Sequence, residues 1–348
     1  MRKRYEEALN DQSDSGNKIR ALSMFIVNFA ASVQQYAQVA SIFFGVYLIV
    51  EGTITQGALI GAVILGGRTM SPLSQLANTL SRVNGALTAY KNLDQLFGAN
   101  SNIAMLSSPI SRPKLDGEIE FKNVSYAFEG ASQAVLQDLS FKIPKGQKVA
   151  LVGKMGSGKS TLSRLIAGIL EPTEGAILID GVDVRQIDQA DLRKNIGVML
   201  QDSWLFSGTV RENIQMGFNE YDDEHVLEIC KVAGVDDFIG SHPKGYELEI
   251  RERGIGLSGG QKQTINLARS LLHKPDILLL DEPTSSMDQG TEQRVIGSLR
   301  EFCEDKTVLI VTHRNPILAI VDRIFVMESG NVITDQTPEQ LGIKRVTK

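Results

Sequence analysis

One stretch of eight residues restricts the fold of this chain more than any other feature. It reads Gly153-Lys-Met-Gly-Ser-Gly-Lys-Ser160 and matches the pattern G-x-x-x-x-G-K-[ST]. The apolar run 148–152 before it predicts a strand, and residues 161–170 after it have helical periodicity. Glycines in such a strand–loop–helix unit let backbone N–H groups turn towards an anion at the start of the helix. The pattern therefore predicts a phosphate-binding loop within an α/β fold.

The residues of this loop have different expected roles. Lys159 is placed to bridge the β- and γ-phosphates of a nucleoside triphosphate, and the Ser160 hydroxyl to bind Mg²⁺. The full set expected to contact the nucleotide here is Gly153, Gly156, Ser157, Gly158, Lys159, Ser160 and Thr161.

A second element supplies carboxylates. The apolar run Ile277–Leu280 predicts a buried strand that ends in Asp281 and Glu282. Ligands of open α/β sheets bind at the carboxyl ends of the strands. We expect Asp281 to hold Mg²⁺ and Glu282 to polarise the attacking water.

The remaining pattern from residue 117 onwards alternates short strands with helices. Strands are expected at 119–128, 148–153, 176–180, 196–201, 277–281 and 307–312, helices at 161–170 and 291–303, and a closing hairpin at 323–337. This alternation predicts a mainly parallel α/β sheet.

A glycine pair precedes another predicted helix, at 262–273. The motif Leu257-Ser-Gly-Gly-Gln261 offers Ser258 as N-cap, and Gly259 and Gly260 leave backbone N–H groups exposed. A capped helix explains these residues without a ligand, but they would also form a second anion site. Because one nucleotide does not need two γ-phosphate sites in one chain, we expect a two-fold dimer in which each chain completes the other's site.

From about residue 117 to the end, the chain resembles the nucleotide-binding domain of ABC transporters. The Leu257–Gln261 motif separates it from kinases, small GTPases and helicases, which share only the phosphate loop. The implied fold class is an α/β P-loop NTPase with a helical subdomain. The implied ligands are ATP and Mg²⁺, with Ser160, Gln201 and Asp281 around the metal and Ser258, Gly259, Gly260 and Gln261 on the partner's ATP.

The resemblance assigns further roles. Tyr126 matches the aromatic residue that stacks on adenine, and the alternative is a strand aromatic in the core. Asp288 matches the loop that crosses the dimer interface, and His313 the histidine that contacts the γ-phosphate. The implied catalytic set is Glu282, His313, Gln201 and Lys159.

The N-terminal part differs sharply in charge. Residues 21–50 contain no charged side chain, and neither do residues 52–67. Uncharged, mostly apolar runs of this length predict membrane-spanning helices, here at about 20–50 and 57–80. Basic residues lie before the first run and after the second but not between them, which places both ends in the cytoplasm. The alternative is a buried helical hairpin of a soluble protein.

We therefore expect three regions: a partial, truncated all-α transmembrane domain at 1–97, a linker at 98–116 and the nucleotide-binding domain at 117–348. The net charge of −5 argues against nucleic acid held by bulk basic charge. Two cysteines are too few for a disulfide framework or a four-cysteine zinc site.

Membrane spans fused to the nucleotide-binding domain are a feature of ABC exporters. The segment Glu252-Arg253-Gly254 also resembles an exporter element, which touches intracellular loops of the membrane domain. The stretches 51–60 and 67–76 most resemble bacterial type I secretion exporters. That likeness implies a multi-pass protein of the bacterial inner membrane, working as a homodimer in contact with lipid. It also implies a periplasmic adaptor, an outer-membrane channel and an exported protein as partners.

Three alternatives remain open from the sequence. The chain could export lipids, drugs or processed peptides, or be an ATPase that does not transport. It could also be an inactive fragment that lacks four upstream membrane helices.

Overall fold

The computed structural model describes residues 2–104, 109–131, 133–201, 204–218, 221–240 and 242–343. They divide into two compact units, with the boundary between residues 105 and 106. This boundary lies within the predicted linker, whose residues 105–108 are outside the described part of the chain. Residues 98–104, also predicted as linker, instead continue a helix, because no proline interrupts the chain between Pro72 and Pro109.

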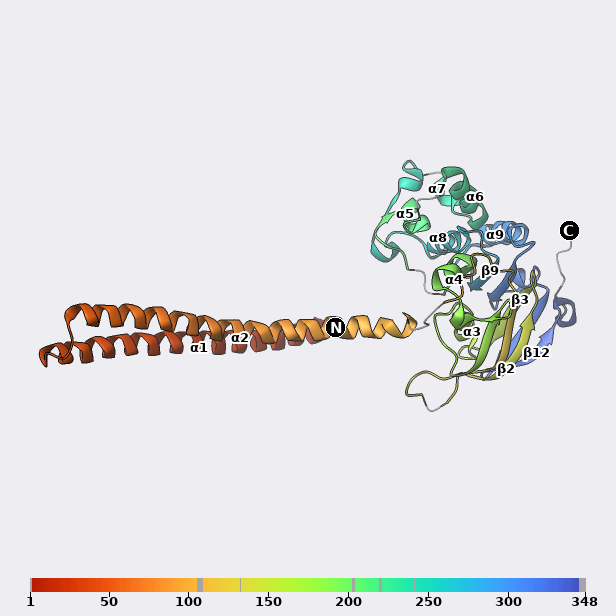
Figure 1. Ribbon diagram of the computed structural model, residues 1–348. Helices are drawn as coiled ribbons and strands as arrows, with labels where there is room; N and C mark the ends of the chain where they lie inside the picture. The colour runs from red at the N-terminus through yellow and green to blue at the C-terminus, as the bar shows by residue number, and fades with distance from the viewer. Residues whose placement is uncertain are drawn as a thin grey trace. The chain divides into compact units, whose positions relative to one another are not determined.

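The first unit is a pair of long antiparallel helices, α1 (Arg2–Val50) and α2 (Gln56–Ala104), joined by a short turn (Figure 1). Gly45 lets the helices approach closely, since a Cβ there would lie 2.1 Å from Leu59 Cδ1. Within α1, Ala31–Val50 is long and apolar enough to cross a membrane, and only 6 % of that window is buried. It is the one segment of the described residues that meets this criterion, so the predicted span at 57–80 does not.

The second unit is built round a six-stranded sheet with the order β12-β11-β3-β10-β9-β6. The strands are β3 (Lys148–Gly153), β6 (Ile196–Met199), β9 (Ile277–Asp281), β10 (Thr307–Val311), β11 (Arg323–Glu328) and β12 (Asn331–Gln336). All neighbours pair in parallel except β12, which pairs antiparallel with β11 at the edge. Every residue of β9 and β10 is buried, as central strands covered on both faces require.

A four-stranded antiparallel sheet packs beside the first, with the order β2-β1-β4-β5. Its strands are β1 (Ile119–Tyr126), β2 (Leu136–Ile143), β4 (Glu174–Ile179) and β5 (Val182–Asp183). The two sheets share one core, in which Phe141 stacks on Phe121 at 4.4 Å and meets Phe325 edge-on at 5.1 Å. The sequence pattern predicts the mainly parallel sheet but not this antiparallel one.

The helices fall into two groups. Near the sheets lie α3 (Lys159–Ile166), α4 (Gln189–Asn195) and α10 (Asn315–Leu318). A separate helical subdomain (Figure 1) contains α5 (Val210–Gln215), α6 (Asp223–Ala233), α7 (Asp236–Ile239) and α8 (Gly259–Leu271), packed with α9 (Gln289–Phe302) and the short pair β7 (Gly208–Thr209) and β8 (Glu249–Ile250). Single 3₁₀ turns occupy Val184–Gln186, Gly245–Glu247, Glu252–Gly254 and Pro338–Leu341.

Candidate active site

The loop between β3 and α3 follows the path that its glycines predict. Gly158 has a φ of 99°, and a Cβ there would lie 2.5 Å from the Leu136 side chain. At Gly153, a Cβ would lie 2.2 Å from the carbonyl oxygen of Met327. Both positions therefore require glycine. No side chain caps the start of α3, so its N–H groups and the positive end of its dipole are available to an anion.

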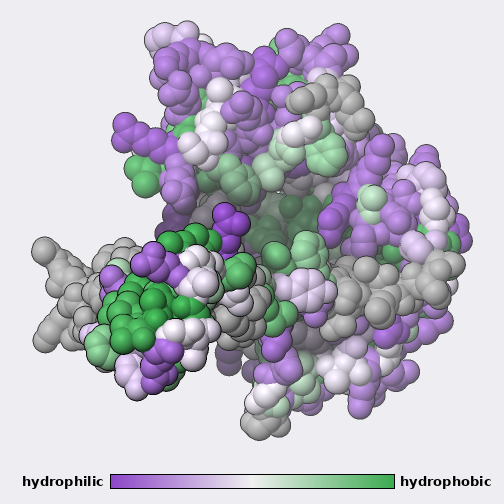
Figure 2. Space-filling model, turned by 60° about the vertical axis from the view of Figure 1, so that its left-hand side comes forward, coloured by the Kyte–Doolittle hydropathy of each residue, from purple (hydrophilic) through white to green (hydrophobic). Residues whose placement is uncertain are grey.

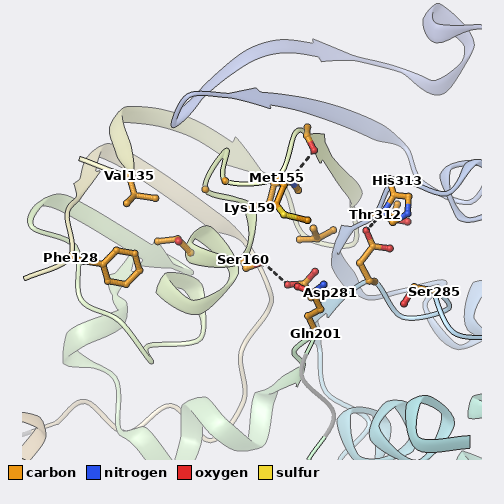
Figure 3. A pocket seen from close by; sticks show the side chains of 16 residues that line it. Phe128, Val135, Met155, Lys159, Ser160, Gln201, Asp281, Ser285, Thr312 and His313 are labelled. Carbon is orange, nitrogen blue, oxygen red and sulfur yellow. Dashed lines mark hydrogen bonds and ion pairs between the residues drawn. The ribbon is translucent and has the colours of Figure 1, made fainter. Parts of the chain in front are cut away.

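A cavity of about 690 Å³ opens at the carboxyl edge of the parallel sheet (Figure 3), a size typical of small-molecule sites. Its walls come from the segments that follow β1, β3, β6, β9 and β10. The lining residues are Phe128, Val135, Gly153, Met155, Gly156, Gly158, Lys159, Ser160, Thr161, Gln201, Asp281, Glu282, Ser285, Val311, Thr312 and His313. Most of the predicted site residues are thus brought together by one sheet edge.

The Lys159 ammonium group is held inside this loop. Its Nζ donates to the carbonyl oxygens of Gly153 and Lys154, each at 2.8 Å. Desolvation lowers the pKa of Lys159, and the nearby carboxylates of Asp281 and Glu282 oppose that shift. A cation held by neutral carbonyls in a partly desolvated cavity gains strongly from an anionic ligand, because charge-assisted hydrogen bonds exceed neutral ones.

Oxygen ligands suited to a hard cation lie beside the lysine. Ser160 Oγ donates to Asp281 Oδ2 at 2.7 Å, and the Asp281 side chain is buried (Figure 3). Gln201 lines the same cavity. Hydroxyl, carboxylate and amide oxygens are the ligand types that Mg²⁺ takes in proteins, usually together with waters and substrate phosphates. These residues fit the expected metal.

Glu282 and His313 form a pair at the ends of β9 and β10. His313 Nδ1 lies 2.5 Å from Glu282 Oε1. Glu282 Oε2 is the one buried side-chain oxygen or nitrogen, among the described residues, that has no hydrogen-bond partner. The backbone of Glu282 is left-handed, with a φ of 51°, and non-glycine residues in that region are strained. Strain and an unsatisfied buried carboxylate oxygen together indicate a functional position.

Tyr126 does not line the cavity. Its side chain is 8 % exposed and belongs to the core between the sheets, so the structure does not support stacking on adenine. Phe128 lies two residues further on, beyond the end of β1, is 45 % exposed and lines the cavity. It meets Tyr126 edge-on at 5.1 Å. Phe128 is the site residue that sequence reasoning missed.

The Ser258–Gln261 segment also lies outside the lining of the cavity. Ser258 Oγ accepts from the N–H of Gln261 at 3.2 Å, and the Gln261 side chain accepts from the N–H of Ser258 at 2.9 Å. This capping box fixes the start of α8. The exposed N-terminus of α8 therefore offers nothing to the cavity of its own chain.

Asp288 caps α9 and accepts from the N–H groups of Gly290 and Thr291, each at 3.0 Å. The bond from Thr291 is the main cause of the lowered pKa of its carboxyl group. Like Ser157, which is buried at the loop, Asp288 does not line the cavity. Helix capping accounts for the conformation of Asp288 within one chain.

The sheet, the loop at the start of α3 and the acids at the end of β9 define a nucleotide-binding domain of the P-loop class. Its family follows from comparison: residues 136–285 match the ABC transporter family. This region of the chain belongs to that family.

Related proteins include exporters of two kinds. Over 295 residues the chain is 36 % identical to YgaD of Bacillus subtilis (strain 168), named as a multidrug export ATP-binding/permease protein, and the match covers 85 % of this chain and 51 % of that protein. Over 309 residues it is 34 % identical to the leukotoxin export ATP-binding protein LtxB of Aggregatibacter actinomycetemcomitans, with 89 % and 43 % covered. The chain thus spans about half the length of the relatives it matches.

A solved structure agrees with these relatives. The chain superposes on a bacterial Atm1-family ABC exporter with ATP bound, with a TM-score of 0.84 and 30 % identity. The match covers 97 % of this chain and 59 % of that one. The chain is therefore related to ABC exporters in both its helical and its nucleotide-binding parts.

Proposed function

We propose that this chain binds and hydrolyses ATP to drive a bacterial ABC exporter. The observation that carries the proposal is the single cavity where Lys159, Ser160, Asp281, Glu282 and His313 meet at one sheet edge. The ABC transporter match and the relationship to exporters support the same reaction.

In the proposed site, the triphosphate lies against the start of α3 and replaces the carbonyl partners of Lys159 with phosphate oxygens. Phe128 offers its exposed ring to the adenine base. Ser160, Asp281 and Gln201 would hold Mg²⁺, which would neutralise charge on the phosphates.

We propose Glu282 as the general base for the water that attacks the γ-phosphate. His313 holds the carboxylate through Oε1, and the carboxylate would accept a proton from a water placed opposite the γ-phosphate. His313 fixes the carboxylate through its Nδ1, and three quarters of its side chain stays exposed to the cavity and solvent. Phosphoryl transfer needs this positioning more than covalent help from the protein.

We further propose a head-to-tail homodimer. The capped N-terminus of α8 is exposed and lies outside its own cavity, so a second copy would supply it to the γ-phosphate. Asp288, at the N-cap of α9, would lie at the same interface. ATP contacts both chains only when the dimer is closed, which gives the difference in affinity that drives closure.

The surface round Arg253 would receive the membrane domain's intracellular loops. Trp204, Phe206 and Ile255 expose 47 %, 50 % and 64 % of their area there. The guanidinium carbon of Arg253 lies 4.7 Å from the centre of the Trp204 ring. Apolar side chains gathered round a basic residue are typical of protein interfaces. Figure 2 shows hydrophobic residues (green) scattered among hydrophilic ones (purple) on one face of the molecule.

For the cargo, we propose a protein exported by type I secretion across the inner membrane. This would require a periplasmic adaptor and an outer-membrane channel, with the nucleotide-binding domain in the cytoplasm. The leukotoxin exporter among the relatives supports this, and the apolar segment Ala31–Val50 supports contact with lipid. The second candidate is export of small molecules, which the similarity to YgaD favours.

Glu282→Gln tests the central proposal. The amide keeps the shape of the side chain but cannot take a proton, so ATP should still bind while turnover falls by about 100-fold or more. Phosphate release from the purified protein in detergent measures turnover, and titration with a fluorescent ATP analogue measures binding. Turnover close to that of the unaltered protein would contradict the role of Glu282, and absence of turnover in the unaltered protein would contradict the proposed function.

A further inference from the structure

The side chain of Gln263, one turn into α8, is bound to the loop that follows β9. Its Nε2 donates to the carbonyl oxygen of Glu282 at 2.6 Å and to Ser285 Oγ at 3.0 Å. Its Oε1 accepts from the N–H of Ser286 at 2.9 Å. The side chain is 6 % exposed, so these bonds are shielded from water. One amide thus bonds three residues of the loop that carries Glu282, namely Glu282, Ser285 and Ser286.

Two glycines in the first turn of α8, Gly259 and Gly260, lie in close contact with the same loop. A Cβ at Gly260 would lie 3.0 Å from the carbonyl oxygen of Ser286, and one at Gly259 would lie 3.2 Å from Ser286 Cβ. The first turn of α8 therefore packs directly against Ser286 of the loop, with no room for a side chain at either glycine of the helix. A displacement of α8 has to displace the loop as well, because close-packed elements do not deform independently.

The far side of the loop is fixed separately. Arg314 Nη1 donates to Glu292 Oε1 at 2.7 Å and to the carbonyl oxygen of Thr284 at 2.9 Å. Thr284 Oγ1 donates to the same Glu292 oxygen at 2.8 Å, and Glu292 is 5 % exposed. On this side the loop is held by the ion pair of half-buried Arg314 with buried Glu292, and its link to α8 comes from Gln263.

We propose that Gln263 is a positioning residue that sets the Glu282 carboxylate according to the position of α8. The inference rests on the proposed dimer. There, the N-terminus of α8 serves the partner's ATP while Glu282 serves its own, so Gln263 connects the two ATP sites of the dimer. When Ser258 binds the partner's phosphate, any shift of α8 would move Glu282 through the buried side-chain amide of Gln263.

Gln263→Met tests the link, because methionine keeps the volume and removes all three hydrogen bonds. The purified full chain should lose about tenfold in kcat, while affinity for ATP without Mg²⁺ stays within about twofold. Ser270→Ala is the matched control: Ser270 is buried on the same helix, but its Oγ donates only to Leu267 O within α8. Its kcat should be unchanged, and its thermal midpoint shows what loss of a buried bond in α8 does to folding.

Gln263→Glu distinguishes loss of the hydrogen bond to Glu282 from a change in side-chain packing. An ionised glutamate cannot donate to the Glu282 carbonyl, but a protonated one can and has the shape of glutamine. The ratio of its kcat to that of the unaltered protein should therefore rise severalfold as the pH falls from about 8 to about 6, because burial raises a carboxyl pKa.

The outcomes separate this inference from the proposed function. If the unaltered protein turns over ATP, a normal kcat for Gln263→Met, or a flat pH ratio for Gln263→Glu, overturns the positioning role alone. If the unaltered protein does not hydrolyse ATP, the proposed function is overturned first.

Discussion

At the scale of single residues, the cavity at the end of β1 is lined by Phe128 and not by Tyr126, the aromatic residue expected there. Tyr126 and Phe128 are two positions apart, so on an extended strand both would face the same side. The strand ends at Tyr126, which the core buries, and the chain then turns and exposes Phe128 to the cavity. Where the strand ends depends on pairing with β2 and β4, which the sequence pattern does not reveal.

Phe128→Ala should weaken ATP binding about 5- to 140-fold, because a stacked base contributes about 1–3 kcal/mol. Calorimetric titration with ATP measures this directly. Tyr126→Leu is the control: it removes the ring but keeps an apolar side chain in the core, and it should leave affinity unchanged, since Tyr126 is buried away from the cavity. If Tyr126→Leu weakened binding and Phe128→Ala did not, the original assignment of Tyr126 would stand.

At the scale of elements, a half-buried arginine joins α8 to α5 and to the segment after Gln201. Arg269 donates from Nη1 to the carbonyl oxygen of Trp204 and from Nη2 to Asn213 Oδ1, each at 2.6 Å. Burial lowers the pKa of Arg269 to about 10. Asn213, buried, also bonds Phe206 through both its amide atoms, at 2.9 and 3.0 Å. The elements of the helical subdomain are thus held by polar contacts as well as by their apolar core.

Asn213→Ala should destabilise this subdomain by about 2–4 kcal/mol, because it leaves the N–H of Phe206 and the Nη2 group of the desolvated Arg269 without their acceptor. Trp204 is the sole tryptophan and lies in the affected segment, so its fluorescence during urea unfolding reports the change. Asn213→Asp keeps an acceptor for Arg269 and should lose less. Equal losses of unfolding free energy in Asn213→Ala and Asn213→Asp would contradict a role for the side-chain oxygen at residue 213 as the acceptor for Arg269.

The elements differ in how far the sequence predicts them. β3, β9 and the start of β10 agree with the expected ranges, because uninterrupted apolar runs are the signature of buried parallel strands. β2 is not predicted, since its half-buried alternation is interrupted by a bulge opposite Val124. Helix α3 ends at Ile166, earlier than its periodicity suggests, where Ala167 caps it before a left-handed Gly168.

At the scale of the whole molecule, the α8 motif lies outside the cavity of its own chain. The cavity gathers the residues proposed for the base, the phosphates and Mg²⁺, whereas residues 258–261 do not line it. We therefore expect function to depend on a second copy.

Ser258→Asp tests this dependence. Aspartate is as good an N-cap as serine, so α8 should be preserved, but its charge would meet the partner's γ-phosphate. Turnover should fall at least about tenfold, with ATP binding to the single chain unchanged in the calorimeter. Ser258→Thr, which keeps a neutral cap, should retain most of the turnover, and full activity of Ser258→Asp would contradict the shared site.

The sequence by itself determined the phosphate loop, the acids after β9 and the ABC transporter motif, because these depend on local spacing along the chain. It also marked the apolar segment of α1, since absence of charge needs no tertiary information. Only the tertiary structure decided that Phe128 rather than Tyr126 reaches the cavity, and that Gln263 holds the loop of Glu282. These facts depend on strand ends and on contacts between distant segments, which are fixed only when the core packs.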